Sequence, residues 1–252
     1  MIYDFYCTGS DDQLTLIDNE QAFHRIKLSP KILIDVSSHS ALNSVSCQTH
    51  LLNSTITISF PCILAPTALH RLSSNEHGQL ATFRAAVACS TIMCISTMVS
   101  ICMERIADEH WEQIKANYPR STSQLRYKLY VFKNRQDTQR LIEHAERCGY
   151  KALVVTVDHC EVGNRECDIH NQFSLPYGIQ VENIIDDKCN DFAKAYYDAR
   201  EAVKHGVEGI IVSNHGARHL DTCQSTIVAL PDIMNAISSE VHQIDVHIDG
   251  GV

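Results

Sequence analysis

The feature that most constrains the fold is an alternation of two sequence patterns from residue 61 onward. Short, nearly continuous apolar runs of strand length alternate with amphipathic stretches of helix length. The apolar runs are 61–66, 91–96, 126–131, 152–158, 209–212 and 245–249, and the helical stretches are 75–89, 103–116, 138–148, 196–205 and 226–237. Strands that are apolar on both faces, each followed by a helix, are typical of a parallel sheet covered by helices.

Local signals set some boundaries of these elements. Ser74 or Asn75 is suited to cap the start of the first helix, while Gly149 and Gly206 are placed to end two later ones. Polar residues follow strand after strand, with Ser213-Asn214-His215 as the clearest group. A doubly wound sheet would gather such residues at one switch point, whereas a barrel gathers the ends of all its strands at one mouth. Polar residues on six strands therefore favour the barrel.

Composition excludes several classes. The net charge of −9 argues against a nucleic-acid partner, because phosphate binding needs clustered Lys and Arg. The eleven cysteines are scattered without a CxxC pair, which predicts reduced, intracellular thiols rather than a disulfide scaffold. The uncharged run Ala85–Met103 is long enough for a membrane span, but its Ser and Thr residues favour a buried helix end followed by a buried strand. No dinucleotide or P-loop glycine motif occurs.

A series of motifs makes the prediction specific. They are YDFYCTGSDDQLTL, LAPTAL, TIMCIST, LYVFKNR, TVD with GNRECDIHNQFSLP, SNHGARHLD and IDGGV, in this order from Tyr3 to Val252. Together they resemble the FMN-dependent 2-hydroxy-acid oxidising family, the group of glycolate oxidase and lactate oxidase. SNHGAR is the most specific of them. The resemblance implies an α/β fold of the (β/α)8 TIM barrel type, in agreement with the alternating pattern.

The resemblance also implies the roles of several residues. His215 matches the base that acts on the 2-hydroxy acid, and Asp158 matches the carboxylate that orients it. The substrate carboxylate calls for the fork geometry of arginine. The implied substrate-binding residues are Tyr3, Tyr130, Arg165 and Arg218. His215 and His219 lie four residues apart on a loop rather than a helix face, so no metal site is expected.

The resemblance further implies FMN as the cofactor. The implied contacts are Pro66, Thr67, Ala68, Ser96, Lys128, Thr156, Ser213, Asp249, Gly250 and Gly251. The implied reaction converts an (S)-2-hydroxy acid and O2 to a 2-oxo acid and H2O2. A peroxisomal location and a tetramer-like homo-oligomer are also implied, with neither nucleic acid nor membrane as a partner.

The chain also departs from the family pattern. It ends at Val252, directly after IDGGV, and it is short between Pro176 and Tyr196. We therefore expect a single domain over 1–252 that is truncated at both ends, with a gap near 177–195. Such a barrel would be incomplete, with about six of eight strands, the regions of strands 5 and 8 missing, and exposed sheet edges.

Lys128 stands where the family has a flavin-contacting Gln. It could place a positive charge near the flavin in place of a family Lys that falls in the gap, or it could reflect drift in a chain that no longer catalyses. Two readings of the whole chain therefore stay open, an FMN-dependent oxidase and a catalytically inactive or partly folded fragment of that family.

Overall fold

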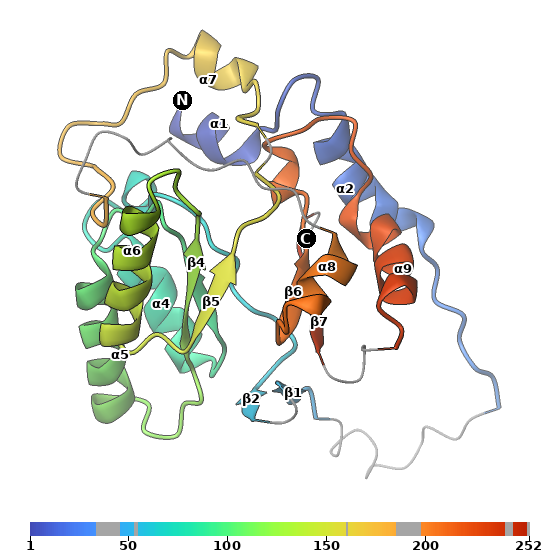
Figure 1. Ribbon diagram of the computed structural model, residues 1–252, viewed down its shortest axis with the longest axis horizontal. Coiled ribbons are helices and arrows are strands. Elements are labelled where there is room, and N and C mark those ends of the chain that lie inside the picture. Colours follow the sequence, from blue (N-terminus) through green and yellow to red (C-terminus); the bar gives the residue numbers. More distant parts are fainter. Residues whose placement is uncertain (34–45, 53–54, 160, 185–197, 240–243, 251–252) are drawn as a thin grey trace.

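The computed structural model describes residues 1–33, 46–52, 55–159, 161–184, 198–239 and 244–250. These residues form three small sheets (Figure 1). The first sheet is an antiparallel pair of strands. The other two sheets are parallel, as the apolar runs from residue 61 onward predicted. They are β1 (Thr49–Leu51) with β2 (Ile56–Ile58), then β3 (Met93–Ile95), β4 (Leu125–Leu129) and β5 (Ala152–Val155), and finally β6 (Gly209–Val212) with β7 (Asp245–Ile248).

Helices cover the two parallel sheets and close the end above them (Figure 1). The helices α4 (Gln79–Ala88), α5 (Met103–Ala116) and α6 (Arg135–Arg147) belong to the first parallel sheet, and α8 (Ala199–Lys204) and α9 (Thr226–Ala236) to the second. The remaining helical segments lie toward the carboxyl ends of the strands. They are α1 (Ile2–Cys7), α2 (Leu14–Arg25), α7 (Glu166–His170) and the two 3-10 turns η1 (His70–Leu72) and η2 (His215–Ala217).

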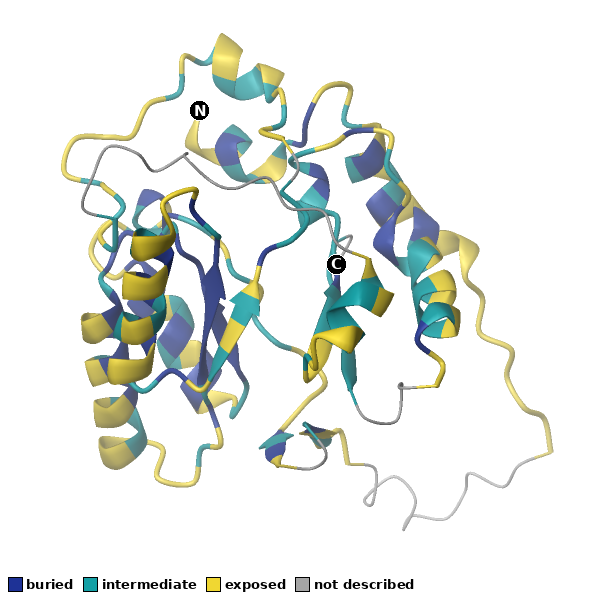
Figure 2. Ribbon diagram, in the orientation of Figure 1, coloured by how far each residue is buried: buried dark blue, intermediate teal, exposed yellow. Residues whose placement is uncertain are grey.

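The main core lies between β4 and the helices beside it. Every residue of β4 is buried, because β3 and β5 flank it in the sheet and helices cover it (Figure 2). Phe83 of α4 and Ile106 of α5 pack in the same apolar cluster as Tyr127 and Leu129 of β4. Each such side chain stabilises the fold by about 1.5–3 kcal/mol when removed from water. This core fixes the ends of β3, β4 and β5 relative to one another.

Five of the six predicted strands form, and the sixth is reduced to a single contact. In the run 61–66 the structure has only one parallel bridge, from Leu64 to Met93. The prediction for 85–103 is confirmed, because α4 ends at Ala88 and β3 begins at Met93. In the described part of the chain, no helix combines the length and apolar character required for a membrane crossing.

The predicted helix boundaries need two corrections. Ser74 and Asn75 do not cap α4, because a turn intervenes and Gly78 occupies the N-cap position. Helix α6 starts at Arg135 rather than at 138, since the Asn134 side chain accepts a hydrogen bond from the backbone N–H of Gln136. Residues 196 and 197 of the predicted helix 196–205 lie outside the described residues.

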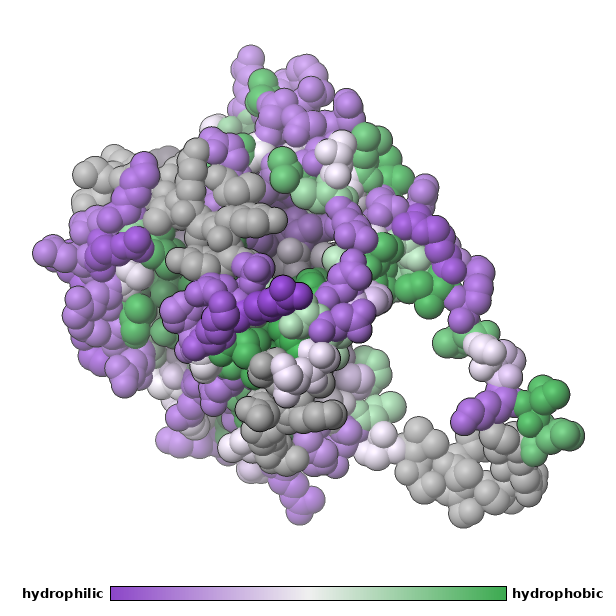
Figure 3. Space-filling view, turned by 45° about the vertical axis from the view of Figure 1, so that its right-hand side comes forward, coloured by the Kyte–Doolittle hydropathy of each residue, from purple (hydrophilic) through white to green (hydrophobic). Residues whose placement is uncertain are grey.

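The sheets do not close into a complete barrel. Among the described residues no backbone pairing joins β5 to β6. On β5, Leu153 and Val155 are 41% and 48% exposed, which is high for apolar residues of an inner parallel strand. The fold is therefore an incomplete barrel with the exposed sheet edge that the sequence predicted. Apolar side chains are also exposed after α2, at Leu28, Ile32 and Leu33, and Figure 3 shows hydrophobic residues on this extended segment.

Candidate active site

Three strands bring their carboxyl ends to one cluster of side chains. Tyr130 follows β4, Asp158 follows β5 and His215 follows β6. The Tyr130 hydroxyl lies 3.0 Å from Nε2 of His215, and Nδ1 of His215 lies 3.1 Å from Oδ1 of Asp158. The imidazole is thus held at both ring nitrogens, and Nδ1–H donates to the carboxylate when Nε2 is the unprotonated nitrogen.

The backbone at His215 is strained. His215 has φ 58°, and Gly216 and Ala217 also have positive φ values of 63° and 61°. Non-glycine residues adopt this region only when their surroundings impose it, and such strain concentrates at functional sites. Part of the support is local, since the hydroxyl of Ser213 accepts a hydrogen bond from the backbone N–H of His215 at 3.0 Å.

The N-terminal segment holds the same loop from the other side. The backbone N–H of Ser10 donates to the carbonyl of Ala217 at 2.9 Å. A Cβ atom at Gly9 would lie 2.8 Å from that carbonyl oxygen, so a larger residue there would push the segment away. The side-chain amides of Asn19 and Asn214 pair reciprocally, at 3.1 and 2.7 Å. Residues about two hundred positions away in the chain therefore position the His215 loop.

Burial leaves the imidazole neutral at neutral pH, and the surrounding groups leave its partner Asp158 ionised. Burial lowers the pKa of His215, and the hydrogen bond to Asp158, which acts in the other direction, does not offset this. Burial alone would raise the pKa of Asp158, but the hydrogen bond from His215 and the positive charges nearby lower it below its usual value. A neutral imidazole beside a carboxylate is the state that a general base requires.

Lys128 is the most deeply placed charge near the site. Its ammonium nitrogen lies 3.3 Å from the centroid of the Tyr130 ring, which is a cation–π contact. Burial lowers the pKa of Lys128 to about 7, and the carboxylates of Asp158 and Asp249 only partly oppose this. Burial therefore brings the neutral form of this lysine within reach near neutral pH.

Two guanidinium groups lie against the same aromatic ring. Arg165 and Arg218 stand over the ring of Phe5, 5.0 and 5.3 Å from its centroid. Arg218 donates to the carbonyl of Thr8 at 3.2 Å, and Arg165 pairs with Asp168 at 2.8 Å. Burial and then the charge of Arg165 lower the pKa of Arg218 to about 10. Nη1 of Arg165 is buried without a hydrogen-bond partner among the described residues.

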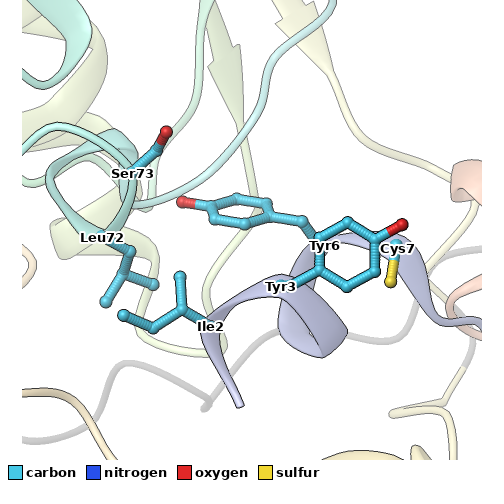
Figure 4. Close-up of a pocket in the computed structure, with 6 residues that line it drawn as sticks. All are labelled: Ile2, Tyr3, Tyr6, Cys7, Leu72 and Ser73. Carbon is cyan, nitrogen blue, oxygen red and sulfur yellow. The ribbon is translucent and has the colours of Figure 1, made fainter.

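Tyr3 is the one predicted substrate-site residue that lies apart from this cluster. It is 77% exposed and lines a surface depression of about 440 Å³ together with Ile2, Tyr6, Cys7, Leu72 and Ser73 (Figure 4). Because α1 is helical, positions 3 and 5 point in different directions, and Phe5 is the buried residue of this helix. The structure therefore places Phe5, not Tyr3, beside the two arginines.

Two further histidines, His219 and His159, lie in the same cluster, and neither was among the residues that the motif matches assigned to catalysis or binding. The ring centroid of His219 lies 4.0 Å from that of His215 and 4.3 Å from that of His159. Burial, and next the neighbouring His215, lower the pKa of His219 to about 3. His219 is therefore neutral at physiological pH and adds no charge that would hinder protonation of His215.

The residues predicted to contact a cofactor largely gather at the strand ends. Ser96, Thr156, Ser213 and Asp249 follow β3, β5, β6 and β7, respectively. Oγ1 of Thr156 and Oδ1 of Asp249 are buried without a hydrogen-bond partner among the described residues. Burial raises the pKa of Asp249, with a hydrogen bond from Ser213 acting against it.

The other predicted cofactor contacts lie on two loops. Pro66, Thr67 and Ala68 follow the Leu64 bridge, and the Tyr6 hydroxyl lies 3.1 Å from the carbonyl oxygen of Ala68. Gly250 has φ 83°, and a Cβ atom there would lie 3.2 Å from Oδ1 of Asn214, so glycine suits this position. Gly251 lies outside the described residues.

Comparisons with known proteins agree with this arrangement. A family model described as FMN-dependent dehydrogenase matches residues 1–196 and 194–252. Glycolate oxidase 3 of Arabidopsis thaliana is 36% identical over 293 residues, covering 100% of this chain and 73% of the relative. Peroxisomal (S)-2-hydroxyacid oxidase GLO4 of the same plant is 34% identical over 290 residues, with the same coverage of both chains.

Comparison with solved structures indicates the same family. A crystal structure of mandelate oxidase with benzoyl-formic acid superposes with a TM-score of 0.82 at 29% sequence identity, covering 100% of this chain and 73% of that one. A second mandelate oxidase structure, with (S)-2-phenylpropionate, gives the same TM-score, identity and coverage. Family model, relatives and structures together show that this chain belongs to the FMN-dependent dehydrogenase family.

Proposed function

We propose that this chain binds FMN and an (S)-2-hydroxy acid, and that His215 is the base that removes the substrate's hydroxyl proton. The observation that carries the proposal is the joint placement of an oriented imidazole and two half-buried guanidinium groups. Tyr130 lies between the two, because its hydroxyl contacts His215 and the charge of Arg218 opposes the rise in the pKa of Tyr130 that burial causes. A substrate with a carboxylate next to a hydroxyl group matches that pairing.

The arginines supply the anion site. Arg165 has a buried Nη1 with no partner among the described residues, and its charge disfavours the charged form of Arg218. A carboxylate between them would accept from the unpartnered donor and relieve the repulsion between the two guanidinium groups. The ring of Phe5 keeps water from one side of both groups.

The protein groups then account for the proton. With the substrate hydroxyl near Tyr130, its proton passes to Nε2 of His215, and Asp158 stabilises the imidazolium through Nδ1. The hydroxy acid loses two hydrogens in all to become the 2-oxo acid, and O2 accepts them to become H2O2. FMN supplies the two-electron acceptor for the hydride equivalent.

The strand ends fit a polar cofactor of this kind. Thr156 Oγ1 and Asp249 Oδ1 are buried polar atoms that lack protein partners, and such atoms call for a bound group or water. Lys128 lies among the same strand ends and adds a positive charge, which would favour an electron-rich ring. We propose that these three residues hold the flavin, together with Ser96, Ser213 and the loops of 66–68 and 249–251.

We further propose one FMN-binding domain over 1–252 that lacks a segment near 177–195. Two observations support the gap. The two family matches meet at residues 194–196. The alignment with glycolate oxidase 3 spans 293 positions for 252 residues, so 41 positions (293 − 252) have no counterpart here. A missing strand there would also explain why β5 and β6 are not paired. The competing proposal is an inactive fragment of the family, and the missing segment near 177–195 is the observation that favours it.

Anaerobic flavin reduction separates the two proposals. The full chain, purified and reconstituted with FMN, should show a bound flavin spectrum that glycolate or mandelate bleaches in the absence of oxygen. His215→Gln should keep the flavin spectrum but slow bleaching by about 10²–10⁴-fold, which is the usual contribution of a general base. A folded chain that takes up no flavin would refute the proposal and support the inactive reading.

Two finer expectations are also proposals with their own measurements. A tetramer-like homo-oligomer predicts a mass by light scattering that is a multiple of the 28.3 kDa chain. A peroxisomal location is supported by the name of one plant relative, and imaging of the tagged chain in cells tests it. Oxygen as the acceptor is tested by measuring peroxide after aerobic turnover.

A further inference from the structure

A second cluster of reactive side chains lies where α5 begins and α6 ends. Glu104 is in the first turn of α5, and His144 and Cys148 lie one turn apart at the end of α6. Their potential ligand atoms all lie within 4.8 Å of one another, and Nε2 of His144 is 2.5 Å from Oε1 of Glu104. The cluster shares no residue with the candidate active site.

We propose that Glu104, His144 and Cys148 form a Zn²⁺ site, with water in the fourth position. Thiolate, imidazole and carboxylate are the three donor types that zinc uses, and three protein ligands with one open position is an established arrangement. Ligand atoms around a tetrahedral zinc lie about 3.5 Å apart. To bind an ion, Nε2 of His144 and Oε1 of Glu104 must therefore move apart by about 1 Å while the longer separations in the cluster shorten, and side-chain rotation supplies both changes.

The backbone around the cluster is already fixed. The buried side chain of Tyr150 donates from its hydroxyl to the carbonyl of Met103 at 3.3 Å, which ties the chain after α6 to the start of α5. Ala145 and Met103 are both part of the main core. His144 and Cys148 share one helix face through their i, i+4 spacing. The Glu104 side chain is 53% exposed, so it can move toward an ion and a water ligand can reach it.

The donor types of the cluster suit a divalent cation. An ion between a thiol and a carboxylate stabilises the carboxylate charge, and a coordinated thiol loses its proton.

Cobalt(II) is the direct probe, because a thiolate ligand gives it a charge-transfer band. The full chain, treated with EDTA and then dialysed, should bind one equivalent of Co²⁺ with this band, and ZnCl2 should displace it. Cys148→Ser should remove the band, and His144→Ala should weaken Zn²⁺ binding in calorimetry by at least about tenfold. Cys89→Ser and His24→Ala change exposed residues outside the cluster and should bind as the parent does.

Thermal unfolding gives a second readout that does not depend on the flavin or on turnover. Saturating Zn²⁺ should raise the Tm of the parent chain, since the ion clamps two helices, and should leave the Tm of a folded Glu104→Gln/His144→Ala double variant unchanged. An unaltered cobalt band in Cys148→Ser would overturn the proposal. So would the absence of saturable Zn²⁺ binding by the parent chain.

Discussion

Nδ1 of His215 lies 3.1 Å from Oδ1 of Asp158, and this contact joins the ends of β6 and β5, which share no backbone pairing. This pair of side chains thus spans the gap between the two parallel sheets of the incomplete barrel. The geometry of the His215–Asp158 contact therefore depends on contacts outside the sheets that position each of the two strand ends. On the His215 side, that support comes from the first 19 residues of the chain, through Ser10 and Asn19.

Replacing Asp158 with Asn should slow flavin reduction while the fold is kept. The amide is nearly isosteric, but it cannot stabilise the imidazolium, and it favours the wrong tautomer of His215. A loss of about 10²–10⁴-fold is expected, in line with the contribution of general-base catalysis. Stopped-flow reduction measures it, with binding of the 2-oxo acid as the control for site integrity. A reduction rate within a few fold of the parent would contradict the orienting role.

Replacing Arg165 with Lys should weaken carboxylate binding more than it slows chemistry. Lysine keeps the charge but lacks the fork that offers Nη1 to an anion. Loss of one charge-assisted hydrogen bond, about 1.5–3 kcal/mol, corresponds to about a tenfold to hundredfold rise in the Kd for oxalate. Titration by calorimetry tests this, and Arg140→Lys on the exposed face of α6 serves as the matched control. Equal oxalate affinity in both variants would remove Arg165 from the anion site.

Replacing Lys128 with Met should change how stability depends on pH. The pKa of Lys128 is about 7 in the folded chain, below its ordinary value of 10.5. Between those values the unfolded chain binds a proton that the folded chain does not, so this residue makes stability rise with pH by roughly 1 kcal/mol per unit. Below pH 7 Lys128 is protonated in both the folded and the unfolded chain, so the full free-energy cost of burying its charge remains. Urea unfolding at pH 7, 8 and 9 should show that slope in the parent and not in the variant. Parallel curves would disprove the low pKa.

The same variant tests whether Lys128 stabilises a negatively charged flavin. Sulfite adds to a flavin more tightly when a positive charge lies near the ring. Lys128→Met and Lys128→Gln should therefore bind sulfite more weakly than the parent when both carry FMN. Unchanged sulfite affinity would instead favour the alternative that Lys128 reflects sequence drift in a chain that no longer catalyses.

Replacing Asp221 with Ala should destabilise the chain through α2. The Asp221 carboxylate accepts from the backbone N–H groups of Leu14 and Thr15, the first two residues of that helix. Losing a cap of this kind costs about 1–2 kcal/mol. Urea unfolding measures the change in the free energy of unfolding, and Asp232→Ala, an exposed residue of α9, is the control. A loss no larger than that of the control would show that α2 does not depend on this cap.

The sequence determined the elements whose signals are local. The apolar runs predicted β3 to β7 because a buried parallel strand must be apolar on both faces, and the amphipathic spacing predicted α5 to its exact ends. Tyr130, Asp158 and His215, which the motif matches assigned to one site, lie in contact because the ends of parallel strands share one side of a sheet. The short strands β1 and β2 offered no such pattern, and each has only three residues.

The tertiary structure alone decided which residues face the site. Helix α1 turned Phe5 rather than Tyr3 toward Arg165 and Arg218, and the fold brought His219 against His215. The support of the His215 loop by Asn19 and the cap of α2 by Asp221 join positions about two hundred residues apart. Contacts over such separations leave no periodic trace in either segment. Hydrophobic periodicity indicates only whether a residue is buried. A site depends on which residues from distant segments the folded chain brings into contact.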